Sequence, residues 1–372
     1  MNIKQKSYVN LSWLVYLVIA VLGFFLVRLF FEELNIANVY DLEMNIYVYD
    51  ALIIVYGFVS CGLVYNGGKL LFYLANGYEF VYFNLYFIGI EKHEGKLRVV
   101  SGLKYDLASK VLMKPKSDDV KTTLPLLGGT IASIAALAIT YLLIFLIDTS
   151  PTTKFFFLVS SMFYIFIVLL NLVPCRMDSL NDGFALFLLK EQDVKKVYLN
   201  NLRNMHAMND QSIELTYCDV EVVDHPIVLE AQLYNYYYLL THDEMDKANE
   251  LAASLYPYYK NYILEEHMNA VFFAKAYSMC YNKQNEELKA FYSKLDSTNK
   301  NAFMEAKQLE VIKSALYIYT FIDEDREGYA KIINGIEKAK NKYKYPRFIP
   351  IQEKLIKEVI KEVQDNKPEW NA

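Results

Sequence analysis

The feature that most constrains this chain is a set of four apolar segments, each long enough to cross a lipid bilayer as a helix. They are residues 11–31, 46–75, 124–147 and 155–174. Crossing a hydrocarbon core of ~30 Å takes about 20 helical residues, and a helix is favoured there because it satisfies its own backbone hydrogen bonds. We therefore expect a four-span transmembrane helical bundle.

The loops between these segments predict an orientation. Residues 32–45 carry four acidic residues and no lysine or arginine, whereas residues 77–121 carry eight basic residues. Basic loops stay on the cytoplasmic side, so a multi-pass cell-membrane protein with both termini in the cytoplasm is expected. Lys4 and Lys6 precede the first segment, and no small-residue cleavage site is evident before Glu32, which favours a retained anchor over a signal peptide.

The two halves of the chain differ in charge. Residues 1–189 hold 14 Lys and Arg against 14 Asp and Glu, while residues 190–372 hold 24 against 29, a net charge of −5. We expect a transmembrane domain in the first range and a cytoplasmic domain in the second. Neither half has the basic stripe that binding a nucleic-acid backbone requires, so nucleic acid is not an expected partner.

A short β structure is expected between the second and third spans. Residues 78–90 are dense in aromatic and β-branched side chains, residues 93–96 have a turn-like composition, and residues 97–100 read Leu-Arg-Val-Val. This pattern predicts a β-hairpin over 78–100, lying at the membrane surface.

A weak repeat runs through the C-terminal half. The tetrapeptides that begin at Tyr237, Tyr277 and Tyr317 are 40 residues apart, and each precedes a charged or polar turn. A fixed period of helical hairpins suggests an all-α, tetratricopeptide-like helical-repeat domain. The fold expected for the whole chain is thus mainly α: a four-span bundle with a small hairpin, followed by helical repeats.

Cysteine and histidine provide no recognisable catalytic or metal-binding pattern. The cysteines have no C-x-x-C spacing, and H-E-x-x-H and H-x-x-E-H are absent. Cys175 invites interpretation as a nucleophile, but no histidine base lies near it in sequence. All the histidines lie outside the predicted spans. These residues are Cys61, Cys175, Cys218 and Cys280, and His93, His206, His225, His242 and His267.

Two stretches, 65–80 and 171–184, resemble the site-2 protease family of intramembrane zinc metalloproteases, particularly its Firmicutes-type branch with a helical cytoplasmic tail. That family has an H-E-x-G-H-L-L-F helix before a G-Y-K-F hairpin, then N-x-x-P and N-D-G. This chain retains Gly68, the run 70–72, the motif 77–80, the pair Asn171 and Pro174, and the motif 181–183. Residues 126–130 also resemble the family's glycine-containing helix start, and the likeness extends over about 10–190.

The metal-binding residues of that motif are replaced. The positions of the two histidine ligands fall on Tyr65 and Lys69, and the position of the glutamate base falls on Asn66. Of the ligands that the resemblance implies, only Asp182 is present. Zinc hydrolysis needs two imidazoles at i and i+4 and a carboxylate base, so the sequence predicts no metal, no cofactor and no catalytic residue at this degenerate site.

Two interpretations of residues 66–69 remain open. They can form a helix C-terminal turn with a snorkelling lysine, or they can belong to a vestigial active-site helix that continues to Ala75. In the second interpretation, an ion pair between Lys69 and Asp182 can replace the metal, because an intramembrane charge needs a partner.

Three functions are compatible with these features. The first is an inactive protease relative, or pseudoprotease, whose groove near Asn171, Pro174, Asp182 and Gly183 binds a transmembrane or peptide client while the repeats bind a cytoplasmic protein. An active paralogue or a second copy of the chain is a further candidate partner. The second is an active intramembrane peptidase with an unrecognised site that processes a peptide precursor. The third is a membrane-anchored scaffold whose spans only locate the repeats.

Overall fold

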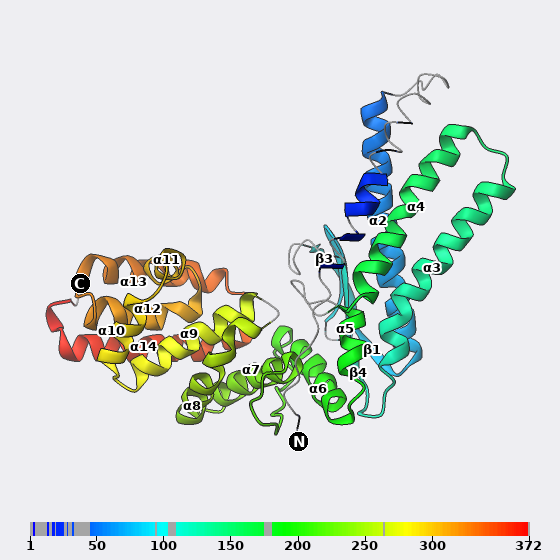
Figure 1. Cartoon of the computed structure of the whole chain (residues 1–372). Helices are drawn as coiled ribbons and strands as arrows, with labels where there is room; N and C mark the ends of the chain where they lie inside the picture. Colours follow the sequence, from blue (N-terminus) through cyan, green and yellow to red (C-terminus); the bar gives the residue numbers. More distant parts are fainter. Residues whose placement is uncertain are drawn as a thin grey trace. The chain divides into compact units, whose positions relative to one another are not determined.

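The computed structural model describes residues 45–93, 95–102, 109–174, 181–262 and 265–370, with scattered positions before residue 45 (Figure 1). The chain divides into two compact units. One is Ser7–Leu202, and the other contains Arg203–Ala372. The first contains the apolar segments and a small sheet, and the second is helical.

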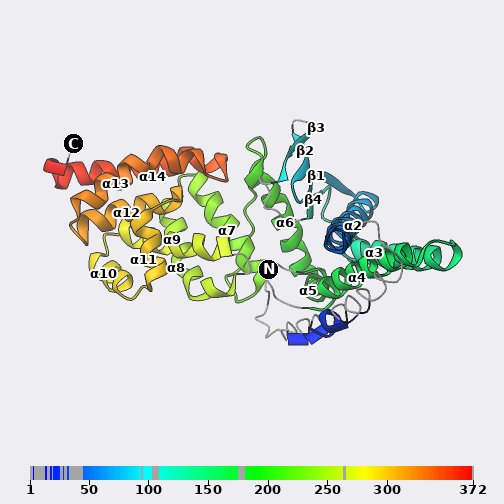
Figure 2. The same ribbon diagram turned by 90° about the horizontal axis from the view of Figure 1, so that it is seen from above.

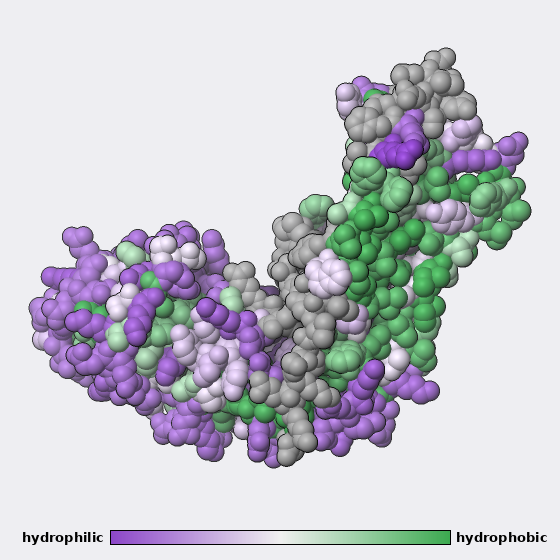
Figure 3. Space-filling model, in the orientation of Figure 1, coloured by the Kyte–Doolittle hydropathy of each residue, from purple (hydrophilic) through white to green (hydrophobic). Residues whose placement is uncertain are grey.

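Among the described residues, three helices are long and apolar enough to cross a membrane: α2 (Ile46–Ala75), α3 (Thr123–Leu146) and α4 (Pro151–Leu172). They confirm the last three predicted segments as helices, and the first, 11–31, is described only at scattered positions. Only 17% to 28% of the most apolar window in each helix is buried within the structure. Most of these side chains therefore face outward, as in a membrane-associated protein, and Figure 3 shows hydrophobic residues over this surface.

Helix α2 continues without a break through residues 66–69, whose structure the sequence left open, and ends at Ala75. The N–H of Asn76, the C-cap residue, donates to the Tyr73 carbonyl, and the next residue, Gly77, has a φ of +87°. Glycine adopts that left-handed conformation without a steric penalty. The alternative of a helix ending at 66–69 is therefore wrong, and Tyr65 and Lys69 lie one turn apart on one helix.

Helices α2 and α3 cross closely where both carry glycine. A Cβ atom added to Gly68 would lie 2.3 Å from the Ala132 Cβ atom and 2.7 Å from the Gly128 carbonyl oxygen, and one added to Gly129 would lie 2.8 Å from the Tyr65 ring. Small residues allow membrane helices this approach, and the close packing stabilises their association. The crossing therefore fixes the face of α2 that carries Tyr65.

The predicted hairpin is part of a four-stranded antiparallel sheet. Its order is β3-β2-β1-β4, and the strands are β1 (Tyr78–Leu85), β2 (Ile88–His93), β3 (Lys96–Ser101) and β4 (Lys110–Pro115). The expectation that residues 78–90 form the first strand of a hairpin was wrong. This range contains β1 and the start of β2, because the chain turns at Tyr86, which has a φ of +55°. The second strand was correctly placed, and β4, which has only six residues, was not expected.

The sheet packs against the end of α2. Tyr73 of α2 and Tyr78 of β1 form an edge-on ring pair with centroids 4.7 Å apart, and both are buried with Met113 of β4 and Leu199. Leu199 belongs to the first part of α6 (Gln192–Asn209). Figure 2 shows the strands beside α2 from a second direction. This small core holds the end of α2 in place next to the candidate site.

In the second unit, three helical hairpins follow the 40-residue period. Helices α7 (Pro226–Thr241), α9 (Glu265–Tyr281) and α12 (Leu309–Phe321) each end in a tight turn with a left-handed residue. Their partners are α8 (Met245–Leu255), α10 (Asn285–Ser293) and α13 (Arg326–Asn341). The remaining helical elements are η2 (Tyr256–Asn261), α11 (Ser297–Glu305), η3 (Pro346–Phe348), α14 (Ile349–Asn366) and η4 (Pro368–Trp370).

The tyrosine and leucine stripe of the repeat is core, as the sequence indicated. Tyr237, Tyr277 and Tyr317 are between 2% and 4% exposed and belong to one hydrophobic cluster. Polar side chains inside the unit satisfy backbone groups. Asn235, for example, accepts from the Cys218 N–H and donates to the Cys218 carbonyl, both at 2.8 Å.

The close crossing of α2 and α3 predicts different effects of adding a methyl group at two adjacent glycines. Gly68→Ala should destabilise the chain by about 1–3 kcal/mol because the added carbon overpacks the contact. Gly67→Ala is the matched control, because its added carbon meets no atom within 4 Å and the helix propensity gained is the same. Thermal unfolding in detergent should lower the midpoint for Gly68→Ala only; equal midpoints would contradict the crossing.

Candidate functional site

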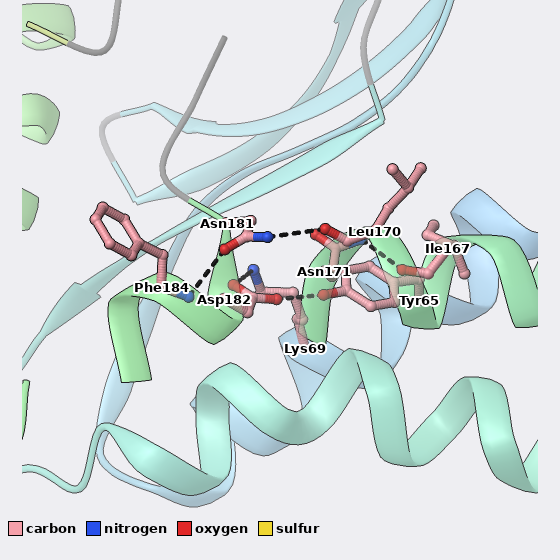
Figure 4. Close-up of polar contacts among 8 residues, drawn as sticks. All are labelled: Tyr65, Lys69, Ile167, Leu170, Asn171, Asn181, Asp182 and Phe184. Atoms are coloured by element: carbon pink, nitrogen blue, oxygen red, sulfur yellow. Dashed lines mark hydrogen bonds and ion pairs between the residues drawn. The ribbon is translucent and has the colours of Figure 1, made fainter. Parts of the chain in front are cut away.

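The candidate site is a buried polar cluster on Asp182, the first residue of α5 (Asp182–Leu188). Lys69 Nζ lies 2.7 Å from Asp182 Oδ1, and the Tyr65 hydroxyl donates to Asp182 Oδ2 (Figure 4). The side chains of Lys69 and Asp182 are only 17% and 7% exposed. Both carboxylate oxygens of Asp182 are therefore engaged by donors from one face of α2, and the predicted ion pair is present.

The i and i+4 spacing explains why two residues of α2 reach one carboxylate. Residues four apart lie one above the other on a helix face. The Lys69 ammonium also lies 5.8 Å from the centre of the Tyr65 ring, where the electron-rich face of the ring favours a cation. The two positions at which the resemblance to the site-2 proteases expects metal ligands thus converge on Asp182, but they offer a phenol and an ammonium.

Asp182 is held in place by the junction between α4 and α5. Asn181 caps α5 by accepting from the Phe184 N–H at 2.8 Å, and its amide donates to the Leu170 and Val173 carbonyls at 2.9 Å and 2.6 Å. A Cβ atom added to Gly183 would lie 2.0 Å from the Leu172 carbonyl oxygen. Each residue of the Asn-Asp-Gly motif therefore has a role. Asn181 bonds the end of α4 to the start of α5, Asp182 supplies the buried carboxylate, and Gly183 lets α5 begin close to the Leu172 carbonyl.

Asn66, at the position where the resemblance expects a glutamate base, does not join this cluster. Asn66 is buried, and its amide donates to the Gly62 carbonyl at 3.1 Å and to Ser109 Oγ at 2.7 Å. Its side chain is thus used to attach the segment before β4 to α2. An amide in this position cannot take a proton from a water molecule.

These residues do not fit a zinc ion. Zinc in a hydrolase takes imidazole, thiolate or carboxylate ligands and keeps one position for water. Here Asp182 is the single carboxylate, its Oδ1 already accepts from the Lys69 ammonium, and that ammonium would repel a dication. Within the described ranges, no three or more His, Cys, Asp and Glu side chains cluster so as to hold a metal.

The remaining candidate residues are more dispersed. The Asn171 amide donates to the Ile167 carbonyl of its own helix at 2.8 Å, and Pro174 follows α4 directly. Both lie near the α4–α5 junction with Asp182 and Gly183. Cys175 lies outside the described residues, while Cys61, Cys218 and Cys280 are buried free thiols.

Two roles in this site were not expected from the sequence. From the sequence, Tyr65 has only the place of a replaced histidine ligand, although its position one turn before Lys69 indicates that both residues can reach the same partner. No feature of the sequence predicts the contact between Asn66 and Ser109, because 43 residues separate them and no motif links the two.

A scan against protein-family models, a search of curated proteins and a search of solved structures each returned no match for this chain.

The ion pair predicts a non-additive pattern in a double-mutant cycle. Lys69→Met and Asp182→Asn should each destabilise the chain by about 3–5 kcal/mol, because each leaves a buried charge without its partner. The double variant should recover part of that loss, because neither charge then remains. Thermal unfolding of all four proteins in detergent measures the coupling; strictly additive losses would contradict a buried ion pair.

Proposed function

We propose that this chain is a pseudoprotease of the site-2 protease type, which binds a membrane or peptide client without cleaving it. The observation that carries the proposal is the bonding of Lys69 and Tyr65 to Asp182. In this proposal the three side chains occupy the place of a catalytic metal centre, and they keep its helices together without its chemistry.

The chemistry of the cluster supports the absence of hydrolysis. Peptide hydrolysis at such a site requires an activated water and a base to accept its proton. Lys69 and Tyr65 both donate to Asp182, so the carboxylate acts as an acceptor within a structural cluster. Asn66 is an amide engaged elsewhere. No described residue of the cluster is left to act as a base.

The sheet supports the client-binding part of the proposal. Strand β3 is an edge strand, and its Leu97 and Val99 side chains are 68% and 76% exposed. An edge strand offers unpaired backbone groups to which an extended peptide can add. We propose that an extended segment of the client pairs with β3 and that its membrane part lies beside the α4–α5 junction at Asn171 and Pro174.

The second unit is proposed to bind a cytoplasmic protein. The three hairpins with a 40-residue period support a tetratricopeptide-like array, and such arrays bind partners on their concave surface. The basic segment 77–121 supports a cytoplasmic position for this unit. In the proposal, four spans place the array at the inner face of the cell membrane, where it links the client to its partner.

Photo-crosslinking tests client binding in the full-length chain. A photoreactive amino acid at Val99 and, separately, at Asn171 should capture the same polypeptide in native membranes. The control position is Phe145, which is 82% exposed and lies near the C-terminal end of α3. A photoreactive residue there should capture lipid without that polypeptide. The captured client should have the same length in cells with and without this chain.

Other outcomes would overturn the proposal in distinguishable ways. A client that is shortened only when the chain is present would indicate an active peptidase. Failure to capture any polypeptide from Val99 or Asn171, with normal capture of a partner from the helical repeats, would indicate a scaffold.

A further inference from the structure

A cavity of about 230 Å³ lies inside the C-terminal unit and takes no part in the function proposed above. It is formed where α7, α9 and the start of α12 meet the segment after α13, and Tyr237, His267, Glu310 and Tyr343 line it. All of these residues belong to the unit that contains Arg203–Ala372. The cavity is small for a drug-sized ligand, since such pockets measure ~300–1,000 Å³, but it can hold one or two amino-acid residues.

The acceptor in this cavity is the Glu310 carboxylate. Its Oε1 accepts from the Tyr237 hydroxyl at 2.9 Å and from the Tyr343 hydroxyl at 2.6 Å. Burial first, and then the charge of Glu310, raise the pKa of both tyrosines well above the usual value, so both remain donors. No hydrogen bond to Oε2 occurs within the described part of the chain, which leaves this oxygen as an acceptor for a ligand.

Neighbouring charges do not occupy that acceptor. The Lys313 ammonium donates to the backbone carbonyl of Glu310 and to Gln352, at 2.9 Å and 2.7 Å, rather than to the carboxylate. The second carboxylate of the cavity, Glu266, is already paired with Lys344 at 2.8 Å. Burial acts to raise the pKa of Glu266, but the bond and charge of Lys344 outweigh it and keep the pKa low.

His267 provides a second free acceptor. It is only 9% exposed, it lines the cavity, and its closest charged contact is Glu266 Oε1 at 4.0 Å from Nε2. No hydrogen bond to its ring nitrogens occurs among the described residues. Burial lowers its pKa to about 4, so at neutral pH the ring is uncharged and its unprotonated nitrogen can accept a hydrogen bond from a ligand.

The lining of the cavity also contains cationic donors and apolar walls. Lys307 and Lys342 line it and are exposed, and Tyr237 and Leu309 add an aromatic and an apolar side chain. The cavity therefore combines carboxylate and imidazole acceptors with ammonium donors. An α-amino group with a neighbouring carbonyl or carboxylate matches this combination, since an ammonium has three N–H donors and favours aromatic faces.

We propose that this cavity binds the α-ammonium group of a peptide amino terminus or of a free amino acid, with Glu310 as its anionic anchor. The site would let the C-terminal unit bind a small ligand independently of client binding at the membrane. A loss of this binding leaves the pseudoprotease proposal untouched, because no residue of the Asp182 cluster contributes to the cavity.

Fluorescence anisotropy on the full-length chain in detergent tests the proposal. The probes are pentapeptides X-Ala-Ala-Ala-Lys, with X each of the twenty amino acids and fluorescein on the lysine side chain. The best probe should bind about tenfold or more weakly when its amino terminus is acetylated or when the protein carries Glu310→Gln. The matched control Glu324→Gln, an exposed carboxylate outside the cavity lining, should leave binding unchanged.

The two sources of the ammonium are then separated by competition. Displacement by the free amino acid X identifies an amino-acid site, and failure to displace identifies a peptide terminus. The proposal is overturned if no probe binds, if the acetylated probe binds equally well, or if Glu310→Gln binds normally. If Glu310→Gln loses helix content by circular dichroism, the acetylated probe decides the result.

Discussion

The arrangement of the membrane unit depends on one buried charge, the Asp182 carboxylate. A carboxylate within a helical bundle is costly unless it is paired and hydrogen-bonded, and Lys69 and Tyr65 supply both forms of compensation. Because these donors lie one turn apart on α2, the pairing fixes the rotation of α2 as well as its position. The charge thereby ties α2 to α5, the short helix that follows α4.

Close backbone packing makes that pairing geometrically possible. The glycines at the α2–α3 crossing let the Tyr65 ring lie directly over α3, and Gly183 lets α5 begin against the end of α4. The Asn181 amide then donates to the carbonyls of Leu170 and Val173 at the end of α4. The motifs on which the resemblance to the site-2 proteases rests thus have structural roles in this chain that do not involve catalysis. These roles are compatible with the proposed pseudoprotease, in which the shape of the site is used without a metal.

How far the sequence predicted this structure depends on the kind of interaction involved. The long apolar segments predicted the bounds of α2, α3 and α4 within a few residues, because a helix is the structure that satisfies the backbone hydrogen bonds of such a segment internally. The 40-residue spacing gave the ends of α7, α9 and α12 because each tight turn follows a buried tyrosine stripe. The ion pair of Lys69 and Asp182 was predictable only through the family resemblance, since 113 residues separate the two. The break at Tyr86, strand β4 and the contact of Asn66 with Ser109 depend on tertiary packing that no local pattern records.

The most direct test of the central claim is the metal content of the purified, full-length protein, measured by inductively coupled plasma mass spectrometry. The wild-type chain, purified without chelators in the presence of zinc, should contain far less than one zinc per chain. The variant Tyr65→His, Asn66→Glu, Lys69→His, which restores the ligand types beside Asp182, should bind more. One zinc per wild-type chain, lost on Asp182→Ala, would contradict the account.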